Sequence, residues 1–139
     1  DTGYEALQQL DIPVEVIEPA LLASTNLSRF TAIVVGPRAY EASEVLVKQN
    51  PRLLDFARAG GTLVVQYGAQ NMNALPGITP YPLQWAPRAA RVTMEQAPVT
   101  LLQPTHPLLT TPNRIGPADW TGWVQERATY MPSVIDRRY

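Results

Sequence analysis

Proline is spread unevenly along this chain, and its placement limits where long helices or central strands can form. Of the 14 prolines, 4 lie in residues 1–75 and 10 lie in residues 76–139. Proline donates no backbone hydrogen bond and breaks the interior of a helix, so the second part can hold only short elements. The sequence therefore predicts a regular first part followed by an irregular, proline-rich extension.

The first part alternates between helical and strand patterns. Tyr4, Leu7 and Leu10 recur at three-residue spacing, which is typical of a short amphipathic helix. The β-branched residues at 12–17 predict a strand bounded by prolines. The continuous apolar run at 31–35 predicts a strand that is buried on both faces of a parallel sheet.

Helices are predicted between and after these strands. Residues 41–49 have a helical pattern, and Asn50 followed by Pro51 predicts the start of a second helix, with Asn as its cap. The glycine pair at 60–61 predicts a left-handed end to that helix, and a further strand follows at 62–65. Strands that alternate with helices through short turns indicate right-handed βαβ crossovers in a mostly parallel, three-layer α/β sandwich.

In the extension, short strands are predicted at 90–94, 99–102 and 128–131, and a short helix at 117–124. We expect residues 1–139 to form a single domain. Because a doubly wound domain normally begins with a central strand and this chain begins with a helical pattern, we expect the chain to be a fragment that follows such a strand.

The composition excludes several classes of function. The chain has no cysteine and one histidine, so disulfides, thiolate nucleophiles and zinc sites with cysteine ligands are excluded, and we expect no metal and no cofactor. A net charge of -1 provides no broad attraction for nucleic acid. No apolar run approaches the ~20 residues that a membrane span needs, so the sequence predicts a soluble domain and leaves the compartment open.

Polar side chains follow the two best-defined strands, where ligands collect in open α/β sheets. The loops 36–41 and 66–71 combine glycine with side chains that donate and accept hydrogen bonds. The candidate ligand-binding residues are Arg38, Tyr40, Glu41, Gln66, Tyr67 and Gln70. The alternative is that Arg38 and Glu41 form a local ion pair while the amides satisfy the backbone of the turns.

Other chemistry-bearing residues lie in the extension. Trp120 and Trp123 are candidates for stacking on a sugar face, with a core role as the alternative. Asp119 and Glu126 are candidates for a carboxylate pair, although the sequence does not give their separation. His106 has no second histidine or carboxylate near it in sequence, which favours a structural or surface role. We assign no catalytic residue.

The segment 60–70 resembles the nucleophile-elbow segment of class I glutamine amidotransferase-like domains. In that family a helix ends at a Gly-Gly pair, a strand follows, and a cysteine occupies the sharp turn after it. Tyr67 stands at this turn, and a phenol does not replace a thiolate in attacking an amide. The resemblance therefore implies an amidotransferase-like domain without glutaminase activity.

A narrower resemblance covers nearly the whole chain. The segments 35–40, 60–68, 105–107 and 115–127, the last with Asp119-Trp120-Thr121-Gly122-Trp123, are similar to an uncharacterised amidotransferase-like domain. That domain lies C-terminal to PIG-L-type N-acetylglucosamine deacetylases in some bacteria. The resemblance implies a flavodoxin-like sheet and an attached deacetylase domain. The zinc motif of the deacetylase is absent, so none of its catalytic residues is transferred.

These observations support three hypotheses. The first is a non-catalytic binding or scaffolding module for a glycan or another small polar ligand, accessory to the deacetylase. The second is a hydrolase that uses Glu41 or Glu126 with Arg38, Tyr67 or His106, which requires these groups to converge in one cleft. The third is a purely structural domain whose tryptophans face a neighbouring domain.

Overall fold

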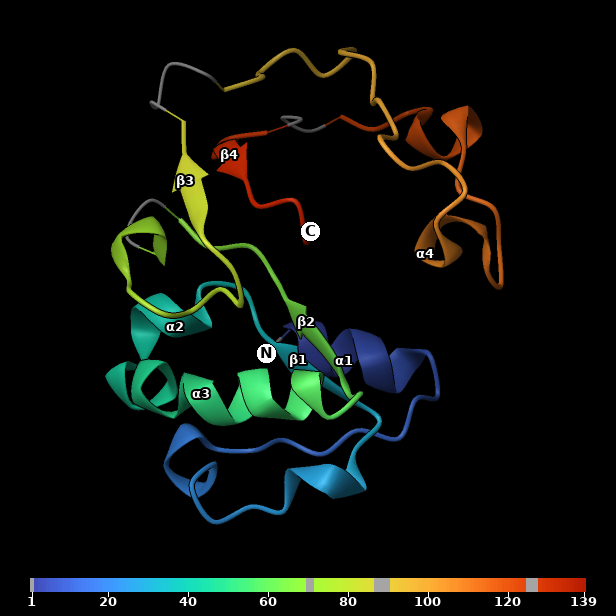
Figure 1. The fold of residues 1–139 in the computed structure, drawn as a ribbon. Coiled ribbons are helices and arrows are strands. Elements are labelled where there is room, and N and C mark those ends of the chain that lie inside the picture. Colours follow the sequence, from blue (N-terminus) through green and yellow to red (C-terminus); the bar gives the residue numbers. More distant parts are fainter. Residues whose placement is uncertain (1, 70–71, 87–90, 125–127) are drawn as a thin grey trace. The chain divides into compact units, whose positions relative to one another are not determined.

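A computed structural model describes residues 2–69, 72–86, 91–124 and 128–139. Its internal contacts divide the chain into two compact units, one formed by Asp1–Leu83 with Ile135–Tyr139 and the other by Gln84–Val134. This division falls close to the point where proline becomes frequent. Figure 1 shows the elements of both units.

The first unit contains most of the regular structure. Its elements in chain order are α1 (Thr2–Gln9), the short 3-10 helices η1 (Pro19–Leu21) and η2 (Leu27–Arg29), β1 (Ala32–Val35), α2 (Ala39–Ala42), α3 (Glu44–Arg58), β2 (Thr62–Val65) and η3 (Met72–Ala74). The predicted helix at the start of the chain and the strands at 31–35 and 62–65 are confirmed. Strands β1 and β2 pair in parallel, with Ala32 opposite Thr62 and Val35 opposite Val65.

Helix α3 begins at Glu44 because Ser43 caps it. The Oγ atom of Ser43 accepts a hydrogen bond from the backbone N–H of Leu46 at 3.1 Å, and Ser43 has extended backbone angles. The preceding turn of helix, α2, is therefore a separate element. The predicted left-handed end of α3 is confirmed, since Gly60 has a φ of 100° and the N–H of Gly61 bonds to the carbonyl of Phe56 at 3.0 Å.

The predicted start of a second helix at Asn50 and Pro51 is wrong. Helix α3 continues through Pro51, which lies inside it. Asn50 is 1% exposed, and its side chain caps nothing. Its Oδ1 atom accepts a hydrogen bond from the Tyr40 hydroxyl at 2.5 Å, and its Nδ2 atom donates to the carbonyl of Gly77 at 2.7 Å. These hydrogen bonds satisfy the buried side-chain amide of Asn50. Asn50 is therefore an interior residue, although the local sequence is typical of a helix cap.

The apolar core lies in the first unit. The buried residues Leu22, Leu27, Val35, Tyr40, Leu46, Leu53, Phe56 and Ile78 form one cluster, and Ile33 and Leu63 pack against it from the sheet. Helix α3 contacts β2, as Figure 1 also shows. One face of the two-stranded sheet is therefore covered by α3.

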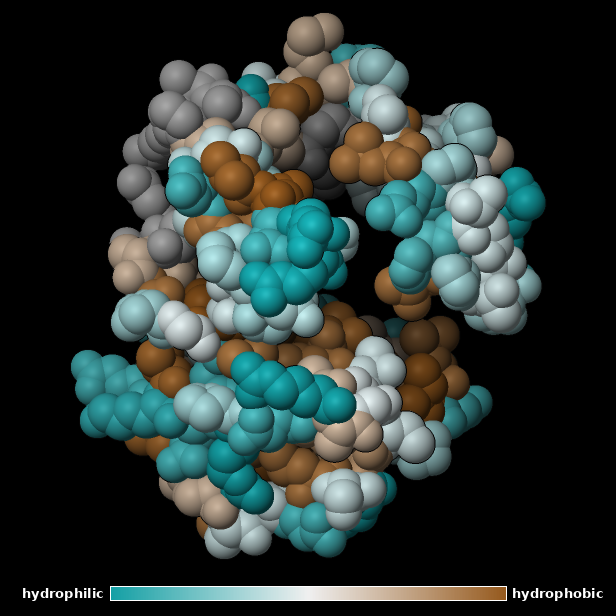
Figure 2. All heavy atoms as spheres, viewed as in Figure 1, coloured by the Kyte–Doolittle hydropathy of each residue, from teal (hydrophilic) through white to brown (hydrophobic). Residues whose placement is uncertain are grey.

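The predictions for the other face and for residues 12–17 are wrong. Val34 and Val64 lie opposite each other in the sheet and are 41% and 44% exposed, so β1 is not buried on both faces. Residues 12–17 form no strand, because no described strand pairs with them; Ile12 and Val16 are 45% and 59% exposed. Figure 2 shows hydrophobic side chains at the surface among hydrophilic ones.

The rest of the chain has short elements, as its prolines predict. They are β3 (Leu83–Trp85), α4 (Pro107–Thr110), the 3-10 helix η5 (Pro117–Trp120) and β4 (Pro132–Ile135). Strands β3 and β4 form a second two-stranded sheet that the sequence patterns did not predict.

The predicted elements of this part are mostly wrong. The strands at 90–94 and 128–131 are reduced to one antiparallel bridge between Val92 and Ala128, Ala90 lies outside the described residues, and 99–102 is not a strand. The helix predicted at 117–124 is the single turn η5, which ends where Thr121 becomes extended and Gly122 has a φ of 79°. The described chain is thus mixed α/β with a small parallel sheet.

Candidate strand-end site

The two loops predicted to hold a site do come together at the carboxyl ends of β1 and β2. The backbone N–H of Arg38 donates to the carbonyl of Tyr67 at 2.7 Å. The Glu41 Oε1 atom accepts from the backbone N–H groups of Ala69 at 2.5 Å and Met72 at 3.2 Å. Because β1 and β2 are parallel neighbours, the turns that follow them lie at the same edge of the sheet.

Glu41 is the acceptor that holds these loops together. Its other carboxylate oxygen, Oε2, accepts from the Arg38 Nε atom at 2.8 Å, and the Glu41 side chain is only 6% exposed, whereas that of Arg38 is 62% exposed. The hydrogen bond from Arg38 lowers the pKa of Glu41; burial opposes this effect, and the N–H groups of Ala69 and Met72 reinforce it. The ion pair between Arg38 and Glu41, the alternative to a ligand-binding role, is present in the structure.

The backbone at Arg38 is unusual. Its φ of 58° places it in the left-handed region, which costs energy for a residue with a side chain. The bond to the Tyr67 carbonyl and the ion pair with Glu41 hold this conformation. Such strain is retained where the surrounding structure determines the shape of a turn, and it is frequent near binding sites.

Tyr40 is part of the core and is not available to a ligand at the surface. Its side chain belongs to the buried cluster, and its hydroxyl donates to Asn50. Burial raises the pKa of Tyr40 to about 12, because a phenolate would be poorly solvated there. Of the three candidates in the first loop, Tyr40 and Glu41 thus have buried side chains that bond to other groups of the chain.

An open depression of about 430 Å³ lies beside the strand ends. It is lined by Gly3, Ala6, Pro37, Gln66 and Tyr67, which come from α1 and from the residues that follow β1 and β2. The backbone N–H of Gln66 bonds to the carbonyl of Val35 at 3.0 Å and so extends the ladder into the lining. Tyr67 is 56% exposed. The lining thus offers an amide and a phenol ring.

The depression does not assemble the groups that a hydrolase needs. Its lining includes Tyr67 but neither Arg38 nor a carboxylate. The carboxylate of Glu41 already accepts three hydrogen bonds from Arg38, Ala69 and Met72. The residues that line this depression therefore do not bring together the groups that the hydrolase hypothesis required.

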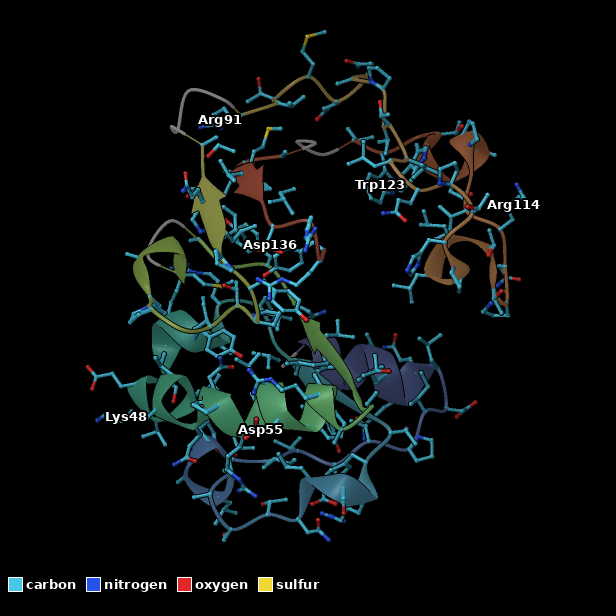
Figure 3. The ribbon with its side chains drawn as sticks, in the orientation of Figure 1. Lys48, Asp55, Arg91, Arg114, Trp123 and Asp136 are labelled. Carbon is cyan, nitrogen blue, oxygen red and sulfur yellow. The ribbon has the colours of Figure 1, made fainter. Side chains whose placement is uncertain are left out.

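The remaining candidates lie elsewhere or outside the described residues. Trp120 and Trp123 belong to the second unit and meet edge to face, with ring centroids 5.0 Å apart and planes at 75°. Trp123, labelled in Figure 3, is 53% exposed. Gln70 lies outside the described residues.

The histidine and the carboxylates of the second unit have local structural contacts. The Nδ1 atom of His106 caps α4 by accepting from the N–H of Leu108 at 3.2 Å. Asp119 Oδ2 accepts from the backbone N–H of Gly116 at 2.7 Å, which fixes the start of η5. Glu126, the suggested partner of Asp119 in acid and base chemistry, lies outside the described residues.

Sequence reasoning missed Gly3 and Ala6, which line the depression. Both lie on α1 three residues apart and therefore on the same side of the helix. Small residues at this spacing leave room beside a helix, and this was the signal available in the sequence. Asn50 was also missed, because its partners Tyr40 and Gly77 are distant from it along the chain.

Within the residues that the structure describes, no three acidic or histidine side chains gather in a way that would hold a metal ion. No helix in this part of the chain combines the length and apolar character needed to cross a membrane. Comparison of the chain with protein-family models, curated proteins and solved structures finds no match. The resemblance to amidotransferase-like domains thus remains a prediction from the residues quoted for it.

Proposed function

We propose that this chain is a non-catalytic, amidotransferase-like module that binds a small uncharged polar ligand, of the sugar class, in the depression at the strand ends. The observation that carries the proposal is the lining itself: Gln66, Tyr67 and small or apolar residues, with no charged side chain among them. The volume of about 430 Å³ lies in the range of small-molecule sites. The proposal includes the flavodoxin-like sandwich that the resemblance implies.

The chemistry of the lining favours a glycan over a charged metabolite. The Gln66 amide both donates and accepts hydrogen bonds, which suits sugar hydroxyls and the amide of an N-acetyl group. The exposed ring of Tyr67 offers a flat apolar surface to the C–H face of a sugar. A carboxylate or phosphate ligand would need a cation in the lining, and the residues that line the depression supply none.

The non-catalytic part of the proposal is supported by the groups at the turn. The chain has no cysteine, and the resemblance to amidotransferase-like domains implies that Tyr67 stands where that family has its nucleophile. The nearest carboxylate in the loops, that of Glu41, is 6% exposed and already hydrogen-bonded. We therefore assign the strand-end loops to binding and shape, with no chemical step.

Calorimetric titration with N-acetylglucosamine oligomers tests the proposal. We expect binding that Tyr67→Ala weakens roughly 5- to 30-fold, because stacking and a hydrogen bond to the ligand contribute roughly 1–2 kcal/mol. Trp123→Ala is the matched control, since Trp123 is 53% exposed and Tyr67 is 56% exposed, but the two belong to different units. Absence of heat with every oligomer would end the glycan proposal, and loss of binding only in Trp123→Ala would place the site at the tryptophans.

The accessory role is a second part of the same proposal. A module that serves a sugar deacetylase should distinguish the acetylated substrate from the deacetylated product. We expect N-acetylglucosamine oligomers to bind more tightly than glucosamine oligomers, whose ammonium groups would find no anionic partner in the lining. Equal or stronger binding of the deacetylated oligomers would contradict this role.

The purely structural alternative is favoured by one observation in the second unit. Trp123 and Val124 are adjacent in sequence and are 53% and 66% exposed, which is unusual for large apolar side chains in sequence neighbours. If this alternative holds, Trp123→Ala should weaken association with a deacetylase domain supplied in trans, while glycan titrations give no heat.

A further inference from the structure

Glu41 joins the two strand-end loops through both of its carboxylate oxygens. Oε1 accepts from the backbone N–H groups of Ala69 at 2.5 Å and Met72 at 3.2 Å, and Oε2 accepts from the Arg38 Nε atom at 2.8 Å. The Glu41 side chain is 6% exposed. A carboxylate is buried as an anion only where such bonds replace its bonds to water. Protonation of Glu41 therefore weakens its bonds to both loops, because a neutral acceptor is the weaker one.

The same contacts fix the backbone of Tyr67, which lines the depression. The residue before it extends the sheet ladder with β1. The Tyr67 carbonyl accepts from the N–H of Arg38 at 2.7 Å, and two residues later the N–H of Ala69 bonds to Glu41. Tyr67 is thus held by the ladder on one side and by the turn that contains Arg38 and Glu41 on the other.

The bond from Arg38 to Tyr67 also depends on Glu41. Arg38 has a φ of 58°, a left-handed conformation that costs energy for a residue with a side chain. Its ion pair with Glu41 compensates for this cost while the carboxylate is charged. When Glu41 takes up a proton, Arg38 loses that support, and its N–H is held less firmly toward the Tyr67 carbonyl.

Close packing connects Glu41 to Tyr67 by a second route. A Cβ atom added at Gly68 would lie 2.0 Å from the Sδ atom of Met72, so the backbone next to Tyr67 lies directly against this side chain. Met72 packs against the buried core, and its N–H is one of the donors to Glu41. A displacement of Met72 therefore reaches the residue that follows Tyr67.

We propose that Glu41 is a positioning residue of the ligand site: its ionised carboxylate holds Tyr67 in the lining, and proton uptake by Glu41 weakens ligand binding. The ligand part of this inference rests on the function proposed above. A ligand that binds the arrangement in which Tyr67 is held loses apparent affinity as the population of that arrangement falls. By linkage, bound ligand must in turn make Glu41 harder to protonate.

The pH range follows from the groups around Glu41. The side-chain bond from Arg38 lowers the pKa of Glu41 most, burial opposes this effect, and the two backbone N–H donors add to it. Because this pKa lies below 4.5, the carboxylate is charged at neutral pH, and the weakening is confined to more acidic solution. Tyrosine side chains stay neutral there, whereas other carboxylates also titrate. The titratable side chains on α2, on the second loop and in the first turn of α3 are, besides Glu41, Tyr40, Tyr67 and Glu44.

A pH titration of the full chain without ligand, followed by NMR, tests the positioning role. We expect the amide protons of Ala69 and Met72 to move upfield together below pH 4.5, because their acceptor becomes neutral. The Arg38 amide and the Tyr67 ring protons should follow with the same midpoint. These transitions should be absent in Glu41→Gln. Glu44→Gln is the matched control, since it removes a carboxylate from the exposed first turn of α3 and should keep them.

Calorimetric titration with the N-acetylglucosamine trimer tests the coupling to ligand. Binding should weaken at least about threefold between neutral pH and the pH at which the amides report a protonated Glu41. Glu41→Gln should bind at least about threefold more weakly at neutral pH and show no further acid loss. For a threefold coupling, saturating trimer should lower the midpoint of the amide titration by about 0.5 pH unit. Circular dichroism confirms folding at each pH. If Glu41→Gln does not fold, the pH profile and the midpoint shift of the unmodified chain decide.

The two parts of the proposal are refuted by different results. Amides of Ala69 and Met72 that do not titrate together, or a Tyr67 ring that does not follow them, would overturn the positioning role. Equal affinity at both pH values, or the same acid loss in Glu41→Gln, would overturn the coupling. A trimer that binds at no pH, while the amides and Tyr67 titrate together, would refute the proposed function and the coupled release and would still support the positioning of Tyr67.

Discussion

Removing the hydroxyl of Tyr40 takes away the donor that satisfies the side-chain oxygen of Asn50 in the interior. The two atoms are 2.5 Å apart, Tyr40 is 3% exposed and Asn50 is 1% exposed. In Tyr40→Phe the ring is kept, so packing changes little while one buried acceptor loses its partner. The bond from Asn50 to the Gly77 carbonyl remains available.

The magnitude follows from the burial of this acceptor. Leaving a buried polar group unsatisfied costs about 1–3 kcal/mol. With a urea dependence of roughly 2 kcal/mol per molar, the midpoint of unfolding should fall by about 1 M. Tyr139→Phe is the control, because the Tyr139 hydroxyl also donates to a carbonyl, that of Tyr81 at 3.1 Å, but at the surface. Its effect should stay below about 1 kcal/mol.

The same substitution should change the dependence of stability on alkaline pH. The pKa of Tyr40 is about 12 in the folded chain against 10.0 for an ordinary tyrosine, so the unfolded chain releases this proton first. Its contribution to stability is complete below pH 10.0 and is lost as pH rises toward 12. At ~1.4 kcal/mol per pKa unit, the loss reaches up to about 3 kcal/mol.

Urea unfolding followed by circular dichroism at 222 nm, which reports mainly α3, measures both effects. The difference in unfolding free energy between the unmodified chain and Tyr40→Phe should be largest near neutral pH and should shrink between about pH 10 and about pH 11. A difference that is negligible near neutral pH would refute the reasoning about Asn50. A difference that stays constant to about pH 11 would refute the assignment of the raised pKa to Tyr40.

Two further substitutions test the strand-end loops and the end of α3. Glu41→Gln should destabilise the chain near neutral pH, and this deficit should shrink as pH falls below 4.5, since the lowered pKa stabilises the fold only while the carboxylate is charged. Glu18→Gln is the control: the Glu18 side chain makes no cap bond to η1, so the substitution should change stability little near neutral pH in the same urea titrations. Gly61→Ala should cost roughly 1–3 kcal/mol, because the added Cβ would lie 2.2 Å from the buried Phe56 ring. Gly116→Ala meets open space and is the control, so equal losses in thermal or urea unfolding would contradict the steric argument.

The parts of the fold that follow local rules could be predicted from sequence. The strands at 31–35 and 62–65 are continuous apolar runs that end at turns, and Gly60 supplies the left-handed residue that ends α3. The helix break at Ser43 and the continuity of α3 through Pro51 were missed. Both depend on the balance between capping hydrogen bonds and hydrogen bonds to residues distant in sequence. A local sequence pattern does not show that balance.

The sequence predicted where the candidate site lies better than it predicted which side chains form it. The rule that loops at the carboxyl ends of parallel strands meet at one edge correctly brought Arg38 and Tyr67 together. The same rule does not say which side chains face outward. Tyr40 packs into the core, Glu41 bonds to the backbone of the second loop, and α1 supplies the wall of the depression.

The sequence by itself determined that the second part is built from short elements, because closely spaced prolines leave too few residues between them for a long helix or a central strand. It also determined that the turn after β2 carries a phenol and no thiolate, since the chain has no cysteine. Only the tertiary structure decided that residues 12–17 stay unpaired, that Val34 and Val64 remain exposed, and that Asn50 is an interior residue. The physical reason is that composition and local geometry act on each residue separately, whereas strand pairing and burial depend on which distant segments are present to meet them.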